Sequence, residues 1–132
     1  MTNEELLSRA RQAMEKSYSP YSKFKVGAAL LTSNNKIYSG CNVENSSFGA
    51  TICAERTAAV KAVSEGEREF VRLAIVSSEG EFTYPCGICR QFYSEFVKDC
   101  IVIMEDRTEG IKEVKFTELF PDMFSFEVKN GN

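Results

Sequence analysis

The stretch "VRLAIVSSEGEFTYPCGICRQFYSEF", residues 71–96, is the most informative part of this chain for its fold. Its first six residues, VRLAIV, are mostly apolar, as expected for a strand that is buried on both faces. After Pro85, apolar residues recur every four positions, which is typical of an amphipathic helix. These residues are Ile88, Phe92 and Phe96. The stretch therefore predicts a buried strand followed by a helix, a unit from which α/β proteins are built.

Periodic segments on both sides extend this prediction. Thr2 and Glu5 have the spacing of a helix capping box, and residues 24–30 alternate between apolar and other side chains. The expected elements are a helix from Thr2 to near Ser17, strands at 24–30, 36–41, 71–76, 100–104 and 111–116, helices at 52–63 and after Pro85, and a helical turn at 117–120. This α-β-β-α-β-α-β-β-α order predicts a mixed sheet with helices on its faces.

Composition limits the classes of function. The chain has 132 residues, of which 43% are hydrophobic, and we expect a single domain over residues 1–132. Lys and Arg total 16 against 19 Asp and Glu, and no basic block is present, so a polymeric nucleic-acid partner is not expected. No apolar run approaches about 20 residues, so no membrane partner is expected. The acidic N-terminal stretch is unlike an export signal, which favours the cytoplasm.

The five cysteines are the main candidates for chemistry. Cytoplasmic thiols are mostly reduced, so a disulfide between Cys86 and Cys89 is the weaker interpretation, although a Cys-x-x-Cys pair alone is weak evidence for any site. Cys53 stands at the start of an earlier helix. In an α/β layout both helix starts can open at one edge of the sheet, where three thiols would meet. Cys41 and Cys100 lie at no helix start, and we expect both to be small buried core residues.

Three converging thiols favour a catalytic zinc site over a structural one. Helix N-termini lower thiol pKa values, and three ligands leave one position of a tetrahedral ion open. Three thiolates on a divalent ion carry a net charge of −1, which Arg56 could offset by donating hydrogen bonds to sulfur. Glu55 could exchange protons with a water molecule at the open position. The alternative is that both residues are simply a solvated first helical turn.

The motifs Cys53-Ala54-Glu55 and "PCGIC" follow the pattern of zinc-dependent nucleobase deaminases, including their three-cysteine variant. From about Pro20 to Phe124 the chain resembles the small homotetrameric cytidine deaminases. The resemblance is carried by "PYSKFKVGAALL", "GCNVEN", "CAERTA", "KAVSEG", "PCGICRQ" and "LFPDMF". It implies a three-layer αβα sandwich with a mixed five-stranded sheet and one zinc ion per chain. The implied activity is hydrolytic deamination of cytidine and 2′-deoxycytidine, in pyrimidine salvage.

The resemblance also assigns roles to residues. The implied metal ligands are Cys53, Cys86 and Cys89, with Glu55 as the proton donor and acceptor and Arg56 as the residue that tempers thiolate charge. The implied substrate-binding residues are Phe24, Asn42, Glu44, Asn45, Ser46, Phe48, Ala54 and Phe124. Asn42 and Glu44 would bind the sugar hydroxyl, since both offer acceptors and Asn also donates. Phe24 would line the pyrimidine pocket, or be ordinary strand core.

Two aromatic residues bear on the expected assembly. Phe124 resembles the residue that a neighbouring subunit inserts over the base, which implies a homotetramer with sites shared between subunits. Phe48 stands where the family often has Tyr, so a contact made by that hydroxyl is in doubt.

Three alternative functions are also consistent with parts of the sequence. One is a deaminase for another aminopyrimidine nucleoside, such as the blasticidin type. The second is a thioredoxin-like redox protein that uses Cys86 and Cys89, which leaves Cys53 unexplained. The third is a structural zinc module, for which Cys41 or Cys100 would have to supply a fourth ligand because the chain has no histidine.

Overall fold

A computed structural model describes residues 1–126 of the chain. The elements in chain order are α1 (Asn3–Met14), β1 (Val26–Thr32), β2 (Ile37–Cys41), the 3-10 helix η1 (Phe48–Ala50), α2 (Ala54–Ser64), β3 (Phe70–Ser77), α3 (Gly87–Tyr93), β4 (Val97–Asp106), β5 (Gly110–Lys115) and α4 (Phe116–Leu119). The predicted order of helices and strands is confirmed. The short η1 was not predicted, because three residues leave no periodicity to detect.

Several element boundaries differ from the sequence expectation by up to about three residues, and two of these differences change the place of an aromatic residue. Helix α3 ends at Tyr93, so Phe96 lies beyond it, and the backbone of Phe96 bonds to both Tyr93 and Phe70. Its ring packs against Phe92 with centroids 5.8 Å apart, which explains why the apolar spacing continues past the helix end. Strand β1 begins at Val26, so Phe24 precedes the strand and is half-buried at the edge of the core.

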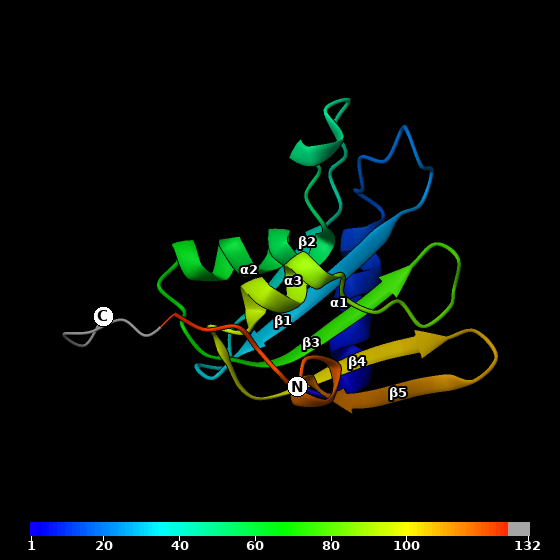
Figure 1. The fold of residues 1–132 in the computed structure, drawn as a ribbon. Coiled ribbons are helices and arrows are strands. Elements are labelled where there is room, and N and C mark those ends of the chain that lie inside the picture. Colours follow the sequence, from blue (N-terminus) through cyan, green and yellow to red (C-terminus); the bar gives the residue numbers. More distant parts are fainter. Residues whose placement is uncertain (127–132) are drawn as a thin grey trace.

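The five strands form one mixed sheet, as predicted, and the structure places them in the order β2-β1-β3-β4-β5 (Figure 1). β1 is antiparallel to both of its neighbours, and β4 and β5 are antiparallel. β3 and β4 are parallel and are connected through α3. A parallel pair needs such a crossover, and this one brings the start of α3 to the end of β3.

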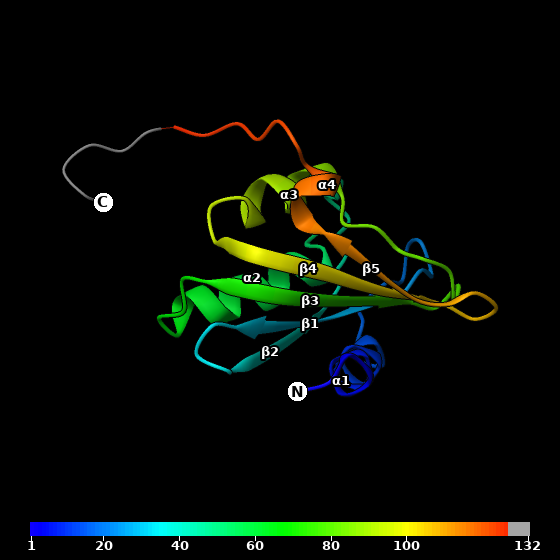
Figure 2. The same cartoon turned by 90° about the horizontal axis from the view of Figure 1, so that it is seen from below.

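Helices cover both faces of the sheet, which gives the predicted three layers (Figure 2). On one face, α1 buries Leu6, Leu7 and Ala10 against the sheet. On the other face, α2, α3 and α4 pack over a larger cluster that includes Tyr93 and Phe116. Every residue of β1 is buried, because consecutive side chains point into opposite cores.

Two glycines let helices approach the sheet closely. A Cβ at Gly27 would lie 2.0 Å from the carbonyl oxygen of Ala10 in α1. A Cβ at Gly40 in β2 would lie 2.6 Å from the backbone nitrogen of Ala58 and 2.8 Å from the carbonyl oxygen of Ala54, both in α2. The absence of a side chain at Gly40 therefore fixes how close α2, and with it Cys53, lies to the sheet.

Strand pairing explains why the two helix starts meet. Gly27 of β1 is opposite Cys41, the last residue of β2, and opposite Val76, near the end of β3. β2 and β3 therefore leave the sheet at the same edge, and the chain then leads to the starts of α2 and α3. The expectation that both helices open at one edge is confirmed. Within residues 1–126, no helix combines the length and the apolar character needed to cross a membrane.

Candidate metal centre and active site

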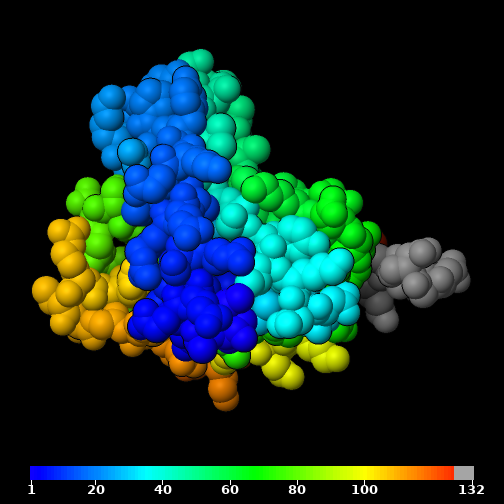
Figure 3. Space-filling view, turned by 180° about the vertical axis from the view of Figure 1, so that it is seen from behind, coloured from blue at the N-terminus to red at the C-terminus, as the bar shows by residue number. Residues whose placement is uncertain are grey.

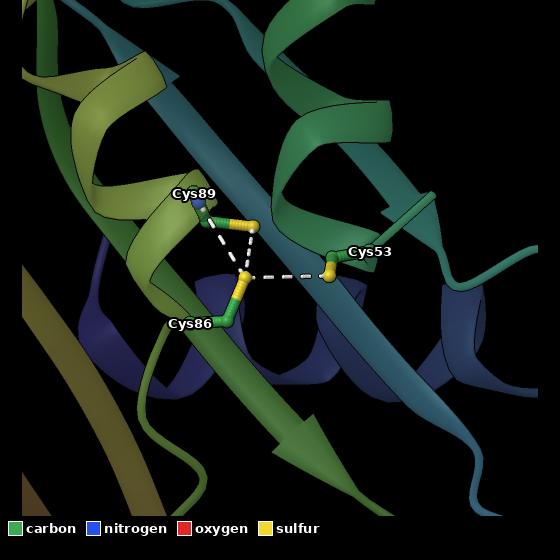
Figure 4. A group of neighbouring side chains, drawn as sticks. All are labelled: Cys53, Cys86 and Cys89. Atoms are coloured by element: carbon green, nitrogen blue, oxygen red, sulfur yellow. Dashed lines mark hydrogen bonds between the residues drawn. The ribbon is translucent and has the colours of Figure 1, made fainter. Parts of the chain in front are cut away.

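The three predicted thiols converge at this edge (Figure 4). Cys53 is the N-cap of α2, Cys86 is the N-cap of α3, and Cys89 lies in the first turn of α3. The Sγ atom of Cys86 lies 3.6 Å from that of Cys53 and 3.3 Å from that of Cys89, and all three Sγ atoms lie within 4.8 Å of one another.

These distances fit three ligands of one zinc ion. Zn–S bonds are about 2.3 Å long, so two sulfurs on a tetrahedral ion lie about 3.8 Å apart. A disulfide bond is about 2.05 Å long, and the five cysteines are free thiols. Three thiolates this close repel one another unless a cation lies among them. Of the residues that the structure describes, only Cys53, Cys86 and Cys89 form such a metal-binding group, which leaves one tetrahedral position without a protein ligand.

The surroundings of the sulfurs favour negative charge. The backbone N–H of Cys89 donates to the Sγ of Cys86 at 3.5 Å, and the Nη2 of Arg56 lies 3.8 Å from the Sγ of Cys53. The neighbouring Cys89 thiol, the Arg56 guanidinium and Cys86 lower the pKa of Cys53 to about 5, although burial opposes this. The pKa of Cys89 is raised by its interaction with Cys53 and by burial. A cation among the three sulfur atoms would favour the thiolate form of the cysteines that bind it.

Cys41 and Cys100 lie outside the group of three. Cys100 is buried, as expected, and burial raises its pKa to about 12. Cys41 is only half-buried, so the expectation that it is a core residue is wrong. It ends the edge strand β2, where a pocket between α1 and α2 reaches its side chain. Neither thiol provides the fourth ligand that a structural zinc module would require.

Glu55 is buried in the first turn of α2, with 4% of its surface exposed. Burial raises its pKa to about 7, and the negative charge of Cys53 adds to this effect. The predicted alternative of a solvated first turn is therefore wrong for Glu55. The hydroxyl of Tyr93 donates to the backbone carbonyl of Glu55 at 2.6 Å, which ties α2 to α3 beside the thiols. Ala54, at the start of α2, is fully buried.

Asn42 is buried and already hydrogen-bonded within the chain. Its Nδ2 donates to the carbonyl of Phe24 at 2.8 Å, and its Oδ1 accepts from the backbone of Val26 at 3.0 Å and from the hydroxyl of Ser17. Asn42 thus holds the segment that leads into β1 beside the end of β2. One N–H of its side chain stays available for a ligand.

Glu44 is bound in the same way by the loop before Phe24. Its carboxylate accepts from the backbone N–H groups of Tyr21 and Ser22, at 3.0 and 3.1 Å, and from the Ser22 hydroxyl. The Ser22 hydroxyl bond is the largest cause that lowers the pKa of Glu44. The same hydroxyl accepts from the backbone N–H of Phe24 at 3.0 Å. Ser22 therefore connects two predicted substrate residues.

The remaining predicted substrate residues are exposed. Asn45 and Ser46 follow Glu44, and Phe48 begins η1 with 78% of its surface exposed. The Phe48 ring meets Tyr21 edge to face at a centroid distance of 6.4 Å. Residues 18–24 and 42–50 together form the protrusion at the top of Figure 3. Phe124, far along the chain, is 67% exposed.

The structure thus gathers the predicted residues into two groups. The thiols, Glu55, Ala54 and Arg56 lie at the starts of α2 and α3, and Phe24, Asn42 and Glu44 are linked by the hydrogen bonds above. The backbone of Val43 pairs with that of Ile52, one residue before Cys53, which joins the two groups. Sequence reasoning missed Ser22 and Tyr93. Tyr93 had a detectable signal, because its position four residues after Cys89 places both on one helix face.

Comparisons with known proteins agree with this geometry. Residues 1–105 match the family described as "Cytidine and deoxycytidylate deaminase zinc-binding region". The chain is 45% identical over 128 residues to a cytidine deaminase of Sporosarcina psychrophila, covering 96% of this chain and 94% of that protein. A crystal structure of cytidine deaminase from Burkholderia pseudomallei superposes with a TM-score of 0.87 at 42% identity, covering 94% of this chain and all of the other.

A blasticidin-S deaminase of Bacillus cereus is less similar, at 34% identity over 107 residues, which cover 75% of this chain and 76% of that protein. The thioredoxin-like and structural-zinc interpretations explain neither these matches nor the three-thiol group beside a buried carboxylate. Zinc is accordingly the metal for which the thiol group is suited. The chain belongs to the zinc-dependent cytidine deaminase family.

Proposed function

We propose that this chain is a cytidine deaminase that hydrolyses cytidine and 2′-deoxycytidine to uridine and 2′-deoxyuridine with release of ammonia. The observation that carries the proposal is the buried Glu55 at the three-thiol group, in a chain 45% identical to a cytidine deaminase. A buried carboxyl group with a pKa near neutrality is suited to accept and return protons.

In the proposed mechanism, Cys53, Cys86 and Cys89 hold the metal. A bound zinc ion supplies Lewis-acid chemistry that lowers the pKa of a water molecule. Glu55 accepts a proton from that water, whose oxygen becomes bonded to C4 of the pyrimidine. Glu55 returns this proton to N3, then takes the remaining proton of the new C4 hydroxyl and delivers it to the amine, so that the C4–N bond breaks and ammonia leaves. Arg56 offsets part of the thiolate charge through its contact with Cys53.

The substrate end of the proposed site is built from the second group of residues. Asn42 offers its remaining N–H, and Glu44 its remaining lone pairs, to a hydroxyl of the sugar. Phe24, which the Asn42 and Ser22 bonds hold in place, forms one wall of the pyrimidine pocket. Ala54, Asn45 and Ser46 complete the contacts that this chain provides.

We also propose that the protein is a homotetramer whose sites are shared between subunits. Phe48 and Phe124 are substrate residues in this proposal, yet both rings project from the chain that carries them. Large exposed aromatic side chains favour contact with another chain. Light scattering coupled to size-exclusion chromatography tests the assembly, and a stable, active monomer contradicts it.

The proposed setting is pyrimidine salvage in the cytoplasm, by a single catalytic domain over residues 1–132. Five free thiols, three of them needed as metal ligands, favour a reducing compartment.

The test is ultraviolet-monitored conversion of cytidine by the purified protein, together with metal analysis per chain. We expect ammonia release from cytidine and 2′-deoxycytidine and close to one zinc per chain. Blasticidin S is the comparison substrate, because a blasticidin-S deaminase is among the relatives. Faster release of ammonia from blasticidin S than from cytidine would reassign the substrate. A protein that holds no metal and oxidises its dithiol reversibly would instead support the redox interpretation.

A further inference from the structure

We propose that Arg90 and Gln91 of α3 are positioning residues that fix the C-terminal segment, residues 119–124, against the metal-binding loop. This proposal goes beyond the site above but rests on the proposed function in one respect, because Phe124 is taken to contribute to substrate binding. The residues concerned come from three separate parts of the chain: the loop before α3, α3 itself and the segment after α4.

Arg90 connects the metal-binding loop to α4. Its Nε donates to the carbonyl of Pro85, next to Cys86, at 2.8 Å. Its Nη1 donates to the carbonyl of Leu119, the last residue of α4, at 2.7 Å. The guanidinium is half-buried, and both bonds have charged donors, which makes them stronger than bonds between neutral groups. One planar side chain therefore fixes the distance between a metal ligand's loop and the end of α4.

Gln91 makes the next connection. Its Nε2 donates to the backbone carbonyl of Phe124 at 3.2 Å. In the part of the chain that the structure describes, residues 121–126 form no helix or strand, and no backbone–backbone hydrogen bond reaches them. Met123 packs at the edge of the core. Figure 1 shows this segment, in orange to red, running beside α3. With so few hydrogen bonds of its own, the segment depends for its position on the Gln91 bond to Phe124 and on the Arg90 bond to Leu119, just before it.

The consequence concerns Phe124. Its ring is 67% exposed, so its backbone rather than its side chain is held by this chain. Under the proposed function, the ring completes the site of a neighbouring subunit. Arg90 and Gln91 then set where the ring lies, and they do so from the helix that carries Cys89. We infer that they affect substrate affinity through Phe124 and contact no substrate themselves.

The experiment combines hydrogen exchange with a double-mutant cycle on the zinc-loaded protein. Arg90→Gln shortens the side chain and removes the charged guanidinium that makes both bonds, and Gln91→Met removes the amide donor, whose hydrogen bonds go to Ser94 and Phe124 and not to the metal-binding loop. The matched control is Arg72→Gln, since Arg72 is also half-buried and donates to two oxygens, those of Met1 and Asn3, on the other face of the sheet. Deuterium uptake in residues 117–126, zinc content, KM and kcat are measured for each.

We expect Arg90→Gln and Gln91→Met to speed exchange in residues 117–126 and to raise KM for cytidine about fivefold or more. Zinc content and kcat should change less than twofold, and Arg72→Gln should change none of these. In a Phe124→Ala background, which raises KM by itself, Arg90→Gln should have little further effect, because coupled residues are not additive. Arg90→Lys should raise KM less than Arg90→Gln but not restore the original value, since an ammonium group lacks the planar set of N–H donors of a guanidinium.

The proposal is overturned if hydrogen exchange in residues 117–126 is unchanged in both Arg90→Gln and Gln91→Met. It is also overturned if Arg90→Gln raises KM as much in the Phe124→Ala background as in the unmodified protein. A Phe124→Ala variant with unchanged KM also overturns it. These outcomes are distinguishable from failure of the proposed function, because cytidine turnover by the unmodified protein tests that function alone. The exchange measurement requires no turnover.

Discussion

Replacing Glu55 by Gln tests the proposed proton transfers most directly. The change keeps the shape of a buried side chain and removes its ability to take up a proton. The hydroxyl of Tyr93, which lies beside Glu55 in the described part of the chain, is not suited to replace it, because it donates to the backbone of Glu55 and burial raises the pKa of Tyr93 well above its ordinary value. General acid–base catalysis contributes about 10²–10⁴ in rate, so kcat should fall by that factor, equivalent to about 3–5 kcal/mol of activation free energy.

The pH dependence of the unmodified protein gives a second expectation. Burial raises the pKa of Glu55 to about 7, and a bound cation would draw this value down. Only the ionised carboxylate accepts a proton from water. We therefore expect kcat/KM to fall about tenfold per pH unit on the acid side of a midpoint at or below pH 7. The residual activity of the Gln variant should lack this decline.

The assay is the loss of cytidine absorbance, with zinc measured per chain in the same samples. Glu65→Gln is the matched control, because Glu65 is exposed and lies at the opposite end of α2. The control should retain full activity. A Glu55→Gln protein that holds zinc and works within tenfold of the unmodified rate would refute the assigned role.

Three further expectations concern the metal and the fold. Cys89→Ala should reduce zinc from about one per chain to near zero and lower the melting temperature, because metal binding is coupled to folding, whereas Cys100→Ala should retain zinc. Tyr93→Phe should lower the free energy of unfolding by about 1–3 kcal/mol, because it removes the buried hydrogen bond from the Tyr93 hydroxyl to the carbonyl of Glu55. Urea unfolding measures this, and an unchanged midpoint would contradict it. Gly40→Ala should lower the free energy of unfolding by about 1–3 kcal/mol and reduce kcat/KM, because the added methyl group would push α2 away from the sheet. Thermal melts test the stability and steady-state kinetics test kcat/KM. A melting temperature equal to that of the unmodified protein would contradict this expectation.

Local patterns predicted most of the secondary structure. Thr2 and Glu5 form the predicted capping box with both of its hydrogen bonds, and all five predicted strands exist. The errors occurred where the tertiary surroundings of a residue, and not its local spacing, decide its place in the structure. Phe96 has helical spacing but lies after the helix. Cys41 is of a residue type that is common in protein cores, but it ends an edge strand. Periodicity reports which residues are apolar, not which neighbour covers them.

The residue pattern was enough to predict the chemistry of the candidate centre: three thiols, one carboxylate and one guanidinium in motifs that match zinc-dependent deaminases. The three-dimensional arrangement of the strands was needed to show that β2 and β3 end at one edge, which brings the Sγ atom of Cys53 to 3.6 Å from that of Cys86, 33 positions away. The tertiary structure likewise shows that Glu55 is buried and that Arg90 and Gln91 hold the segment carrying Phe124. The physical reason is that side-chain chemistry belongs to each residue, whereas burial and long-range contacts depend on strand order and direction, which local spacing does not specify.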